Sequence, residues 1–419
     1  MKVLWLTNTL LPDAARALGL EKTNKEGWLV GLLDSVKKSD ADVTFGVASP
    51  VMATRDGFKA KIDSVTYYGF YEDTFHPENY DAGLEGRLSK IIDDFKPDIV
   101  HIFGTEFPHT LAMTRAFNKP EKILISIQGV CGEIAKHYAD GVPKKVVKRA
   151  TFRDIVRKDA VFSQIEKFSQ RGANEKEALR GVMRVAGRTS FDRDFVMSVN
   201  PSIDYYYMNE TLKADFYKDY EKCEKIPHSI FISQADYPVK GAHYLFKAAG
   251  ILLKEYKDLT IKIAGNPITR HSNIKEILKL PSYGMYLLEL IKKNGLEGHV
   301  EFTGNVSVEK MIELYREASV FVCCSTIENS PNCVGEAMLL NTPVVAADVG
   351  GVSSVMDESD GIIYEAGNVT ELAKAIKRIW DDKEFADSIV AHGRERALNN
   401  HDASTNLERL LEIYGDICK

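Results

Sequence analysis

The sequence lacks the features that mark several common classes of protein. It has no basic excess, with 54 lysine and arginine residues against 60 acidic ones and a net charge of −6, which argues against a dedicated nucleic-acid binder. Its six cysteines contain no CxxC pair, and adjacent Cys323 and Cys324 lie in an apolar run, so we expect buried thiols and no metal site. No apolar run approaches the roughly 20 residues that a membrane-spanning helix needs.

A secretory signal is also missing, because polar Thr7 and Asn8 interrupt the short apolar stretch that follows Lys2. Together with the cysteine usage, which suits a reducing compartment, this pattern predicts a cytoplasmic protein. Such a protein would meet a membrane only from the side, as a peripheral protein on its inner face.

What the sequence has instead is a repeated unit of a short apolar strand, a polar or glycine-bearing turn and a helix. Continuous apolar runs, rather than alternating ones, indicate parallel strands that are covered on both faces. The predicted strands span residues 3–6, 43–47, 99–103, 123–127, 230–233, 259–264, 300–302, 320–324 and 343–347. A chain of 419 residues is long enough for two cores, so we predict an α/β protein of two doubly wound Rossmann-like domains.

A charged segment, residues 217–225, separates the two arrays and ends before Pro227, where a new strand begins. We therefore predict an N-terminal domain at residues 1–215 and a C-terminal domain at residues 226–400. Residues 403–419 carry apolar side chains at helical spacing, and we expect this helix to pack back on the N-terminal domain.

The most informative stretch is residues 320–351, VFVCCSTIENSPNCVGEAMLLNTPVVAADVGG. A buried strand ends near Ser325, a short loop follows, and Pro331 is well placed to open a helix. The backbone amides around Asn332 and Cys333 would then point out of a helix N-terminus at the carboxyl edge of a parallel sheet. Open α/β sheets bind ligands at that edge, and helix-start amides there favour a phosphate. Alone, such a strand–loop–helix start occurs in many unrelated nucleotide binders.

Two glutamates add a sugar-binding hypothesis to this phosphate site. Glu328 lies in the loop and Glu336 in the second turn of the helix, so their carboxylates could face different parts of an extended ligand. A carboxylate accepts hydrogen bonds from neighbouring hydroxyls, the groups that a sugar or a ribose offers. The plainer alternative is a solvated loop residue and a charged residue near the start of a helix.

Several motifs, taken in order, resemble the retaining glycosyltransferases of family 4, which have the GT-B fold. The glutamate pair followed by EAM and TPVVAADVGGV looks like that family's donor-site signature. YPVKGAHYLFKA, LTIKIAGN and VEFTGNVSVEKMIELYREASVFV resemble its upstream motifs in order and spacing. PDIVHIFGTEFPH, ISIQGV and AGRTSFDRDF more loosely resemble a branch concerned with bacterial cell-surface polysaccharides. The resemblance covers nearly the whole chain and implies a GT-B protein whose two domains face each other across a cleft.

This resemblance implies a role for each matching position of the donor site. Glu328 would hold hydroxyls of the transferred sugar and Glu336 the ribose, while Lys240 would neutralise the diphosphate leaving group where no metal supplies charge. The base would lie against Val306, which follows Asn305. The other donor-side positions are Asn329 and Ser330 in the loop, Asn332 and Cys333 through their backbone amides, and Gly27 in a glycine loop.

Two departures from the family's pattern concern the reaction centre. The arginine expected about five residues before Lys240 is replaced by neutral Gln234, which cannot replace a guanidinium, so another cation must help. Arg270 is a candidate by position only, the alternative being a solvated surface side chain. Gln128 stands where many members have a histidine near the sugar. His109 and Arg188 are further acceptor-side candidates, although a histidine at such a position is more often structural.

A local basic excess distinguishes residues 142–171 from the rest of this acidic chain. Nine basic side chains stand against three acidic ones there, interleaved with apolar residues. The apolar side chains are Val147, Phe152, Ile155, Val156, Phe162, Ile165 and Phe168. We expect either an amphipathic pair of helices with a buried apolar side, or a helical surface that docks on an anionic membrane and brings a lipid-linked acceptor to the site.

The resemblance therefore implies a metal-independent, retaining transfer of a hexose-type sugar from a UDP- or GDP-sugar to a saccharide or lipid-linked acceptor, in surface polysaccharide or glycolipid biosynthesis. The nucleotide sugar would be a substrate, and no cofactor is expected. The donor would bind the C-terminal domain and the acceptor the N-terminal one, with closure excluding water. The alternatives are a nucleotide-sugar 2-epimerase, and a non-catalytic partner subunit whose only support is the missing arginine.

Overall fold

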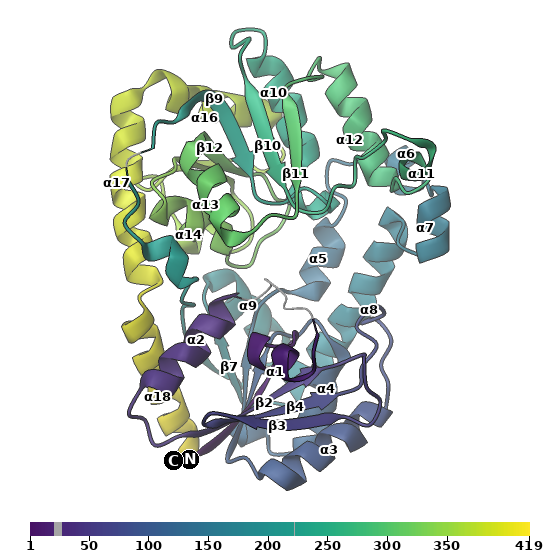
Figure 1. Cartoon of the computed structure of the whole chain (residues 1–419), viewed down its shortest axis with the longest axis vertical. Coiled ribbons are helices and arrows are strands. Elements are labelled where there is room, and N and C mark those ends of the chain that lie inside the picture. The colour runs from purple at the N-terminus through teal and green to yellow at the C-terminus, as the bar shows by residue number, and fades with distance from the viewer. Residues whose placement is uncertain (21–26, 222) are drawn as a thin grey trace. The chain divides into compact units, whose positions relative to one another are not determined.

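The computed structural model describes residues 1–20, 27–221 and 223–419 and divides into two compact α/β units (Figure 1). Unit 1 contains Met1–Glu133, Lys167–Lys213 and Asn400–Lys419, and unit 2 contains Ile134–Glu166 and Ala214–Asn399. The sequence predicts an unbroken N-terminal domain, whereas the structure groups residues 134–166 with the second unit.

Unit 1 is built on one eight-stranded sheet with the strand order β3-β4-β2-β1-β5-β6-β7-β8. Its strands are β1 Lys2–Leu6, β2 Thr44–Pro50, β3 Phe58–Ile62, β4 Val65–Phe70, β5 Ile99–Phe103, β6 Ile123–Ser126, β7 Arg184–Gly187 and β8 Asp204–Tyr207. Neighbouring strands are parallel except for the antiparallel pair β3 and β4. The strand order reverses between β1 and β5, so the topological switch point lies at the carboxyl ends of these two strands.

Helices on both faces of this sheet bury its apolar strands. On one face, α2 (Gly27–Lys38) and α18 (Ala403–Cys418) enclose a core in which the Trp5 indole donates a hydrogen bond to the Tyr414 hydroxyl at 2.8 Å. A second core is supplied by α3 (Gly83–Phe95), α4 (Pro108–Phe117) and α9 (Ser190–Val199). The C-terminal helix belongs to unit 1 because its apolar stripe completes the first of these cores.

Unit 2 has a six-stranded parallel sheet with the order β11-β10-β9-β12-β13-β14. Its strands are β9 Ile226–Ile232, β10 Thr260–Ala264, β11 Val300–Gly304, β12 Ala318–Cys323, β13 Val344–Ala347 and β14 Ile362–Tyr364. The order reverses between β9 and β12, as in the doubly wound dinucleotide-binding sheets. Each strand predicted for the second half is present, which confirms the predicted α/β fold class, and β14 is an addition.

The helices of unit 2 alternate with its strands along the chain. They include α10 Ala242–Leu252, α11 Ile274–Ile277, α12 Ser282–Lys293, α13 Val308–Glu317, α14 Asn332–Leu339, α15 Val352–Val355, α16 Val369–Asp381 and α17 Lys383–Asn400. Among the described residues, none of these helices, nor any of unit 1, combines the length and apolar content needed to cross a bilayer.

The segment 134–166 joins unit 2 through polar contacts with the start of α12. It carries the end of α5 (Cys131–His137), α6 (Lys144–Val147), α7 (Phe152–Arg157) and the first turns of α8 (Val161–Arg180). The Asp154 carboxylate accepts a hydrogen bond from the Ser282 amide at 2.9 Å, and Arg149 forms an ion pair with Glu289 at 2.7 Å. Because these partners lie more than 100 positions away in the sequence, no local pattern predicts the assignment.

Candidate functional site

The loops after β9 and β12 touch at the switch point of unit 2. Gly241 begins α10 with φ 69°, and a Cβ on it would lie 1.7 Å from the Cys324 carbonyl oxygen, so only glycine allows this approach. The Thr326 amide donates a hydrogen bond to the Val239 carbonyl at 2.7 Å. The two loops therefore place the side chains of Lys240 and Glu328 at the same edge of the sheet.

Lys240 and Glu328 form an ion pair, with 2.6 Å between Nζ and Oε1. Burial alone would lower the pKa of Lys240, but the Glu328 carboxylate outweighs burial and holds that pKa above its usual range, so the ammonium is charged. The Ser325 hydroxyl also donates to Glu328 Oε1, at 2.6 Å. Both side chains of the pair keep some exposure, 27% for Lys240 and 13% for Glu328, so a ligand can reach them.

The loop after β13 fixes the backbone of Glu328. The Gly351 amide donates to the Glu328 carbonyl at 3.0 Å, and a Cβ on Gly350 would lie 2.0 Å from the same oxygen. Gly350 also has φ 52°, a left-handed conformation that glycine adopts without strain. The GG pair of the motif thus serves to bring this loop against the glutamate.

Helix α14 starts beside this ion pair, directly after Pro331, and Asn332 and Cys333 form its first turn. The amides of that turn point from the helix N-terminus at the carboxyl edge of the sheet, where the helix dipole favours an anion. Buried Asn329 and half-buried Ser330 complete the loop. In the second turn, half-buried Glu336 accepts a hydrogen bond from the Tyr315 hydroxyl at 3.0 Å. This bond directs the carboxylate inward, unlike the solvated charge of the plainer alternative.

The other half of the same edge carries the predicted base-binding residues. Asn305 Nδ2 donates to Asn266 at 3.1 Å, and Asn266 Nδ2 donates to Asp236 at 2.7 Å, so side chains at the ends of β9, β10 and β11 are linked. Val306 is half-buried beside them, and Arg270 is exposed, with a guanidinium nitrogen 3.9 Å from where a Cβ on Gly304 would lie. The structure thus brings Arg270 over the end of β11, two strands from Lys240.

The acceptor-side candidates lie at the carboxyl edge of the sheet of unit 1. His109 is fully buried, and its Nδ1 lies 2.6 Å from Glu72 while its Nε2 lies 3.0 Å from Asn8 Oδ1. Asn8 in turn donates its amide to Glu106 at 3.0 Å, which fixes the orientation of the Asn8 side chain. Both ring nitrogens of His109 therefore lie within hydrogen-bond distance of oxygen atoms inside the protein. These contacts and the burial of the ring favour the structural alternative for His109 over an acceptor-side role.

Gln128 and Arg188 share one carboxylate, that of Glu210. Gln128 Nε2 donates to Glu210 Oε1 at 2.6 Å, and Arg188 forms an almost fully buried ion pair with Oε2 at 2.6 Å. Gly27 opens α2, and a Cβ on it would overlap the Lys213 side chain. The loop expected before Gly27, residues 21–26, lies outside the described residues.

Several polar residues at these two edges were not predicted. They are Ser325, Tyr315, Asn8, Glu72, Glu106 and Glu210. Asn8 and Glu106 could have been found, because each follows a buried strand at the switch point of the sheet. Glu72 and Glu210 carry no such signal, since their partners come from distant parts of the chain.

The comparisons with known proteins bear on both the domain and the fold. Residues 216–396 match the family described as Glycosyl transferases group 1. D-inositol 3-phosphate glycosyltransferase from Salinispora tropica is 27% identical over 184 residues, 43% of this chain and 36% of that protein. The chain thus aligns with little more than a third of that curated relative's own length.

Two solved structures align over nearly all of the chain. Sucrose-phosphate synthase from Thermosynechococcus elongatus aligns with a TM-score of 0.70 at 13% identity, over 100% of this chain and 99% of that one. Alr3699/HepE from Anabaena, solved in complex with UDP-glucose, aligns with a TM-score of 0.65 at 14% identity, over 99% and 100%. Identities this low show the fold alone. The chain therefore has the GT-B fold, and its residues 216–396 are similar to the Glycosyl transferases group 1 family.

Proposed function

We propose that this protein transfers a hexose-type sugar, with retention and without a metal, from a UDP- or GDP-sugar to a saccharide or lipid-linked acceptor in surface polysaccharide or glycolipid biosynthesis. The observation that carries the proposal is the Lys240–Glu328 ion pair beside the start of α14, inside the glycosyltransferase group 1 domain. A departing diphosphate needs positive charge, and this site supplies it at a helix start.

The ion pair suggests how the site responds to the donor. In the free protein the ammonium of Lys240 is neutralised by Glu328 Oε1. A bound diphosphate offers Lys240 a stronger anionic partner, which releases Glu328 to accept hydroxyls of the sugar. Lys240 would then stabilise the charge that develops on the leaving diphosphate, while the amides of α14 hold the phosphates.

The remaining donor contacts follow from the same edge. Glu336, held inward by Tyr315, is placed to accept the ribose hydroxyls, and Val306 and Asn305 border the base. Arg270 is exposed near Gly304, and we propose that it supplies the second positive charge that the absent arginine would give. Because the Anabaena structure was solved with UDP-glucose, a uracil nucleotide is the first donor to test.

Calorimetric titrations with UDP, UDP-glucose, GDP and GDP-mannose test the donor site in two parts. We expect Glu336→Gln to weaken binding of the nucleotide with or without its sugar, by about tenfold. Glu328→Gln should weaken only the nucleotide sugar, because its partner is the sugar. Glu317→Gln, on α13 and paired with Lys262 at 2.9 Å, is the matched control. Equal loss in the control, or no saturable binding of any nucleotide, would exclude the proposed site.

The alternatives predict different products. An epimerase would alter the sugar nucleotide without an acceptor, whereas the proposed enzyme releases nucleotide only when an acceptor is present. A binding subunit would release none. No contact in the described residues favours either alternative, and a nucleotide-release assay with and without a mixed saccharide and lipid-linked acceptor pool distinguishes all three.

We also propose that unit 2 docks on an anionic membrane. In α7, Phe152, Ile155 and Val156 are 65–66% exposed, although the plainer alternative predicts that they are buried. Ile274 and Ile277 of α11 are also exposed, and the Thr151 hydroxyl, just before α7, donates to the Leu280 carbonyl, just after α11, at 2.7 Å. This bond brings the start of α7 near the end of α11, and we propose that the exposed apolar side chains of both helices act together, here called the α7–α11 surface.

Only some of the nine basic side chains in residues 142–171 are available to bind a membrane. Four of its nine basic side chains make ion pairs or hydrogen bonds with the protein: Arg149, Arg153, Lys167 and Arg171. The other five basic side chains of this region are exposed: Lys144, Lys145, Lys148, Arg157 and Lys158. Two further exposed lysines lie in or just after α11, namely Lys275 and Lys279. Exposed apolar side chains ringed by cations suit the surface of an anionic bilayer.

Vesicle flotation tests this docking. The protein should float with phosphatidylglycerol vesicles at low salt and less so at high salt, and not with phosphatidylcholine alone. The double variant Phe152→Ser/Ile155→Ser should lose flotation. Phe75→Ser is the control, because Phe75 is equally exposed, at 76%, but lies in unit 1. Absence of binding at low salt, or equal loss in the control, rules the surface out.

A further inference from the structure

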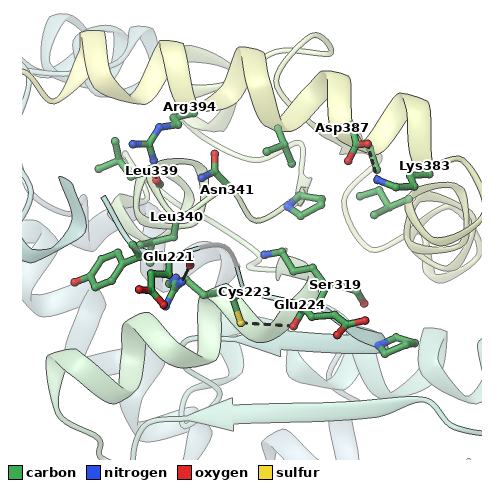
Figure 2. Close-up of a pocket in the computed structure, with 18 of the residues that line it drawn as sticks. Glu221, Cys223, Glu224, Ser319, Leu339, Leu340, Asn341, Lys383, Asp387 and Arg394 are labelled. Carbon is green, nitrogen blue, oxygen red and sulfur yellow. Dashed lines mark hydrogen bonds and ion pairs between the residues drawn. The ribbon is translucent and has the colours of Figure 1, made fainter. Parts of the chain in front are cut away.

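A cavity of about 1000 Å³ lies at the amino edge of the unit 2 sheet, opposite the edge that carries Lys240 (Figure 2). Lys225 directly precedes β9, Ser319 is near the start of β12 and Pro343 directly precedes β13, and all three line the cavity. The seven residues of β9 put the cavity and the donor edge roughly 20 Å apart. The cavity is therefore separate from the candidate donor site, and its volume is that of a small-molecule site.

Lys225 contributes to this cavity a cation that has no carboxylate partner among the described residues. Its ammonium donates to the Thr342 hydroxyl at 3.3 Å, and Thr342 in turn donates to the Tyr315 carbonyl at 2.7 Å. No carboxylate among the described residues lies within ion-pair distance of Lys225. Burial lowers the pKa of this lysine to about 8, and the nearby Arg316 guanidinium contributes to the lowering. A desolvated cation without a counter-charge is unfavourable, and a bound anion would relieve that strain on the folded state.

The acidic residues of the cavity are exposed, and none of them forms an ion pair with Lys225, although Glu224 directly precedes it in the chain. All four are exposed: Asp219, Glu221, Glu224 and Asp387. Asp219 is paired with Arg394 at 3.3 Å and Asp387 with Lys383 at 2.6 Å. Figure 2 shows Arg394, Asp387 and Lys383 along α17 on one side, and Glu221, Cys223 and Glu224 opposite them. The positive charge of Lys225 inside the cavity is therefore not neutralised by the exposed acidic residues that also line it.

Much of the remaining wall is apolar. It is formed by Leu339, Leu340, Ile379, Trp380, Ala386 and Val390. The Trp380 indole is held in place by donating to the Ser319 hydroxyl at 3.0 Å. An apolar wall next to one desolvated cation suits a ligand with an anionic head group and an apolar body.

We propose that this cavity binds a small amphiphilic anion, with its carboxylate or phosphate monoester on Lys225 and its apolar body against Trp380 and the neighbouring aliphatic side chains. Such a ligand contacts residues 218–221 and 223–225, which follow the boundary at 213/214, and α17, which precedes the boundary at 399/400. It therefore engages two of the segments through which the chain passes from one unit to the other, at a place distinct from the donor site.

Fluorescence titration of the full-length protein tests this proposal, because Trp380 lines the cavity and the other two tryptophans, Trp5 and Trp28, lie in unit 1. The probes are hexyl phosphate and octanoate, which distinguish a phosphate from a carboxylate head group. Inorganic phosphate represents the head group of hexyl phosphate alone, and 1-hexanol represents its apolar chain alone. We expect saturable binding of at least one amphiphile, with a Kd about tenfold or more below that of either half. Trp380→Phe should remove the fluorescence change while calorimetry still detects binding.

Two lysine variants locate the head group. Lys225→Met keeps the length of the side chain and should weaken binding by about tenfold or more. Lys383→Met is the matched control, because Lys383 also lines the cavity but is 85% exposed and already paired with Asp387, so its affinity should stay within about twofold. Thermal melting of both variants checks that they fold.

Three outcomes would overturn the proposal. One is the absence of saturable binding of both amphiphiles at millimolar concentration in the wild-type protein. The second is binding that Lys225→Met leaves unchanged in a folded variant. The third is equal binding of 1-hexanol and hexyl phosphate, which would make the cavity merely apolar. None of these results depends on the transfer of a sugar, so they are distinguishable from failure of the proposed enzyme activity.

Discussion

The two sheets reverse their strand order at corresponding places, and at each of these edges a nitrogen-bearing side chain lies against a carboxylate. In unit 1 the pair is His109 and Glu72, with side-chain exposures of 0% and 3%. In unit 2 the pair is Lys240 and Glu328, and both side chains reach the surface. The same topology therefore produced one sealed pair and one accessible pair.

Accessibility determines what each pair can do. The sealed pair is bonded on all sides, to Asn8 and through Asn8 to Glu106, so it holds the strand ends of unit 1 in place. In the accessible pair each charge neutralises the other, and on our proposal a bound anion would take over Lys240. Breaking a buried pair is strongly destabilising, whereas a partly exposed pair can exchange partners with little loss of free energy.

Breaking the sealed pair should give the largest effect. Glu72→Ala leaves the His109 ring beside no carboxylate in a dry interior, and we expect unit 1 to lose about 3–5 kcal/mol of stability. Urea unfolding followed by circular dichroism measures this loss. Glu328→Ala, the same change at the accessible pair, leaves a partly buried ammonium that water can still reach, so it should cost less, about 1–2 kcal/mol. Equal losses in the two variants would remove the distinction between sealed and accessible pairs.

Breaking the accessible pair should instead impair the reaction. Lys240→Ala removes the charge that faces the leaving diphosphate, and we expect kcat to fall by about 10²- to 10³-fold with little change in melting temperature. Lys240→Arg should recover part of the loss. A steady-state transfer assay provides the readout, with Lys262→Ala, from the ion pair with Glu317, as the control that stays within about twofold. A loss no greater than in this control would contradict the proposed role.

A third carboxylate in unit 1, that of Glu175, should make the stability of this unit depend on pH. Burial raises its pKa from 4.5 to about 7, although Thr105 and the amides of Cys131 and Gly132 donate hydrogen bonds to it. Because the folded-state pKa is the higher one, the native state keeps a proton that the unfolded state has lost. Its contribution to stability is therefore complete below about pH 4.5 and falls by about 1.4 kcal/mol per pH unit up to about pH 7.

Glu175→Gln should remove this dependence. We expect the variant and the wild-type protein to have similar stability near pH 5 and the variant to be more stable above about pH 7. Urea titrations across this range measure the difference. A constant difference between the two proteins at all pH values would show that Glu175 does not titrate between the two limits.

The smallest expected effect is that of replacing Lys225 on the stability of the ligand-free protein. Replacing a desolvated, unpaired ammonium by an apolar chain of equal length should leave stability unchanged or raise it, by up to about 1 kcal/mol for Lys225→Met. Thermal melting of the ligand-free protein measures this. A clear loss of stability would mean that Lys225 stabilises the folded protein, as the sealed pair does, and is not held available for a ligand.

The sequence predicted which side chains meet at the carboxyl edge of unit 2 better than it predicted those that meet in unit 1. Lys240, Glu328 and Glu336 belong to short motifs next to strand ends, so local spacing was enough to place them at one edge of a parallel sheet. His109 was named as an acceptor-side residue, but its partners Glu72 and Asn8 come from other parts of the chain and together enclose it. Spacing cannot reveal that a polar side chain has been sealed, because sealing depends on which distant residues cover it.

The segment 134–166 shows the same limit on a larger scale. Its basic and apolar residues were equally compatible with a buried helix pair and with a docking surface. The polar bonds of Arg149 and Asp154 to α12 assign it to unit 2, and α11 supplies the second half of the apolar surface. Both α11 and α12 lie more than 100 positions further along the chain, so the sequence of residues 134–166 alone does not indicate these neighbours.

By itself the sequence determined the alternation of strands and helices, the two doubly wound sheets and the motif that puts a cation, a carboxylate and a helix start together, since periodicity and short spacing encode all three. Tertiary structure alone decided whether the His109–Glu72 or the Lys240–Glu328 pair stays accessible and which unit holds residues 134–166. It also decided that Lys225 has no counter-charge among the residues described. Each of these depends on burial, and burial is set by residues that meet only when the chain has folded.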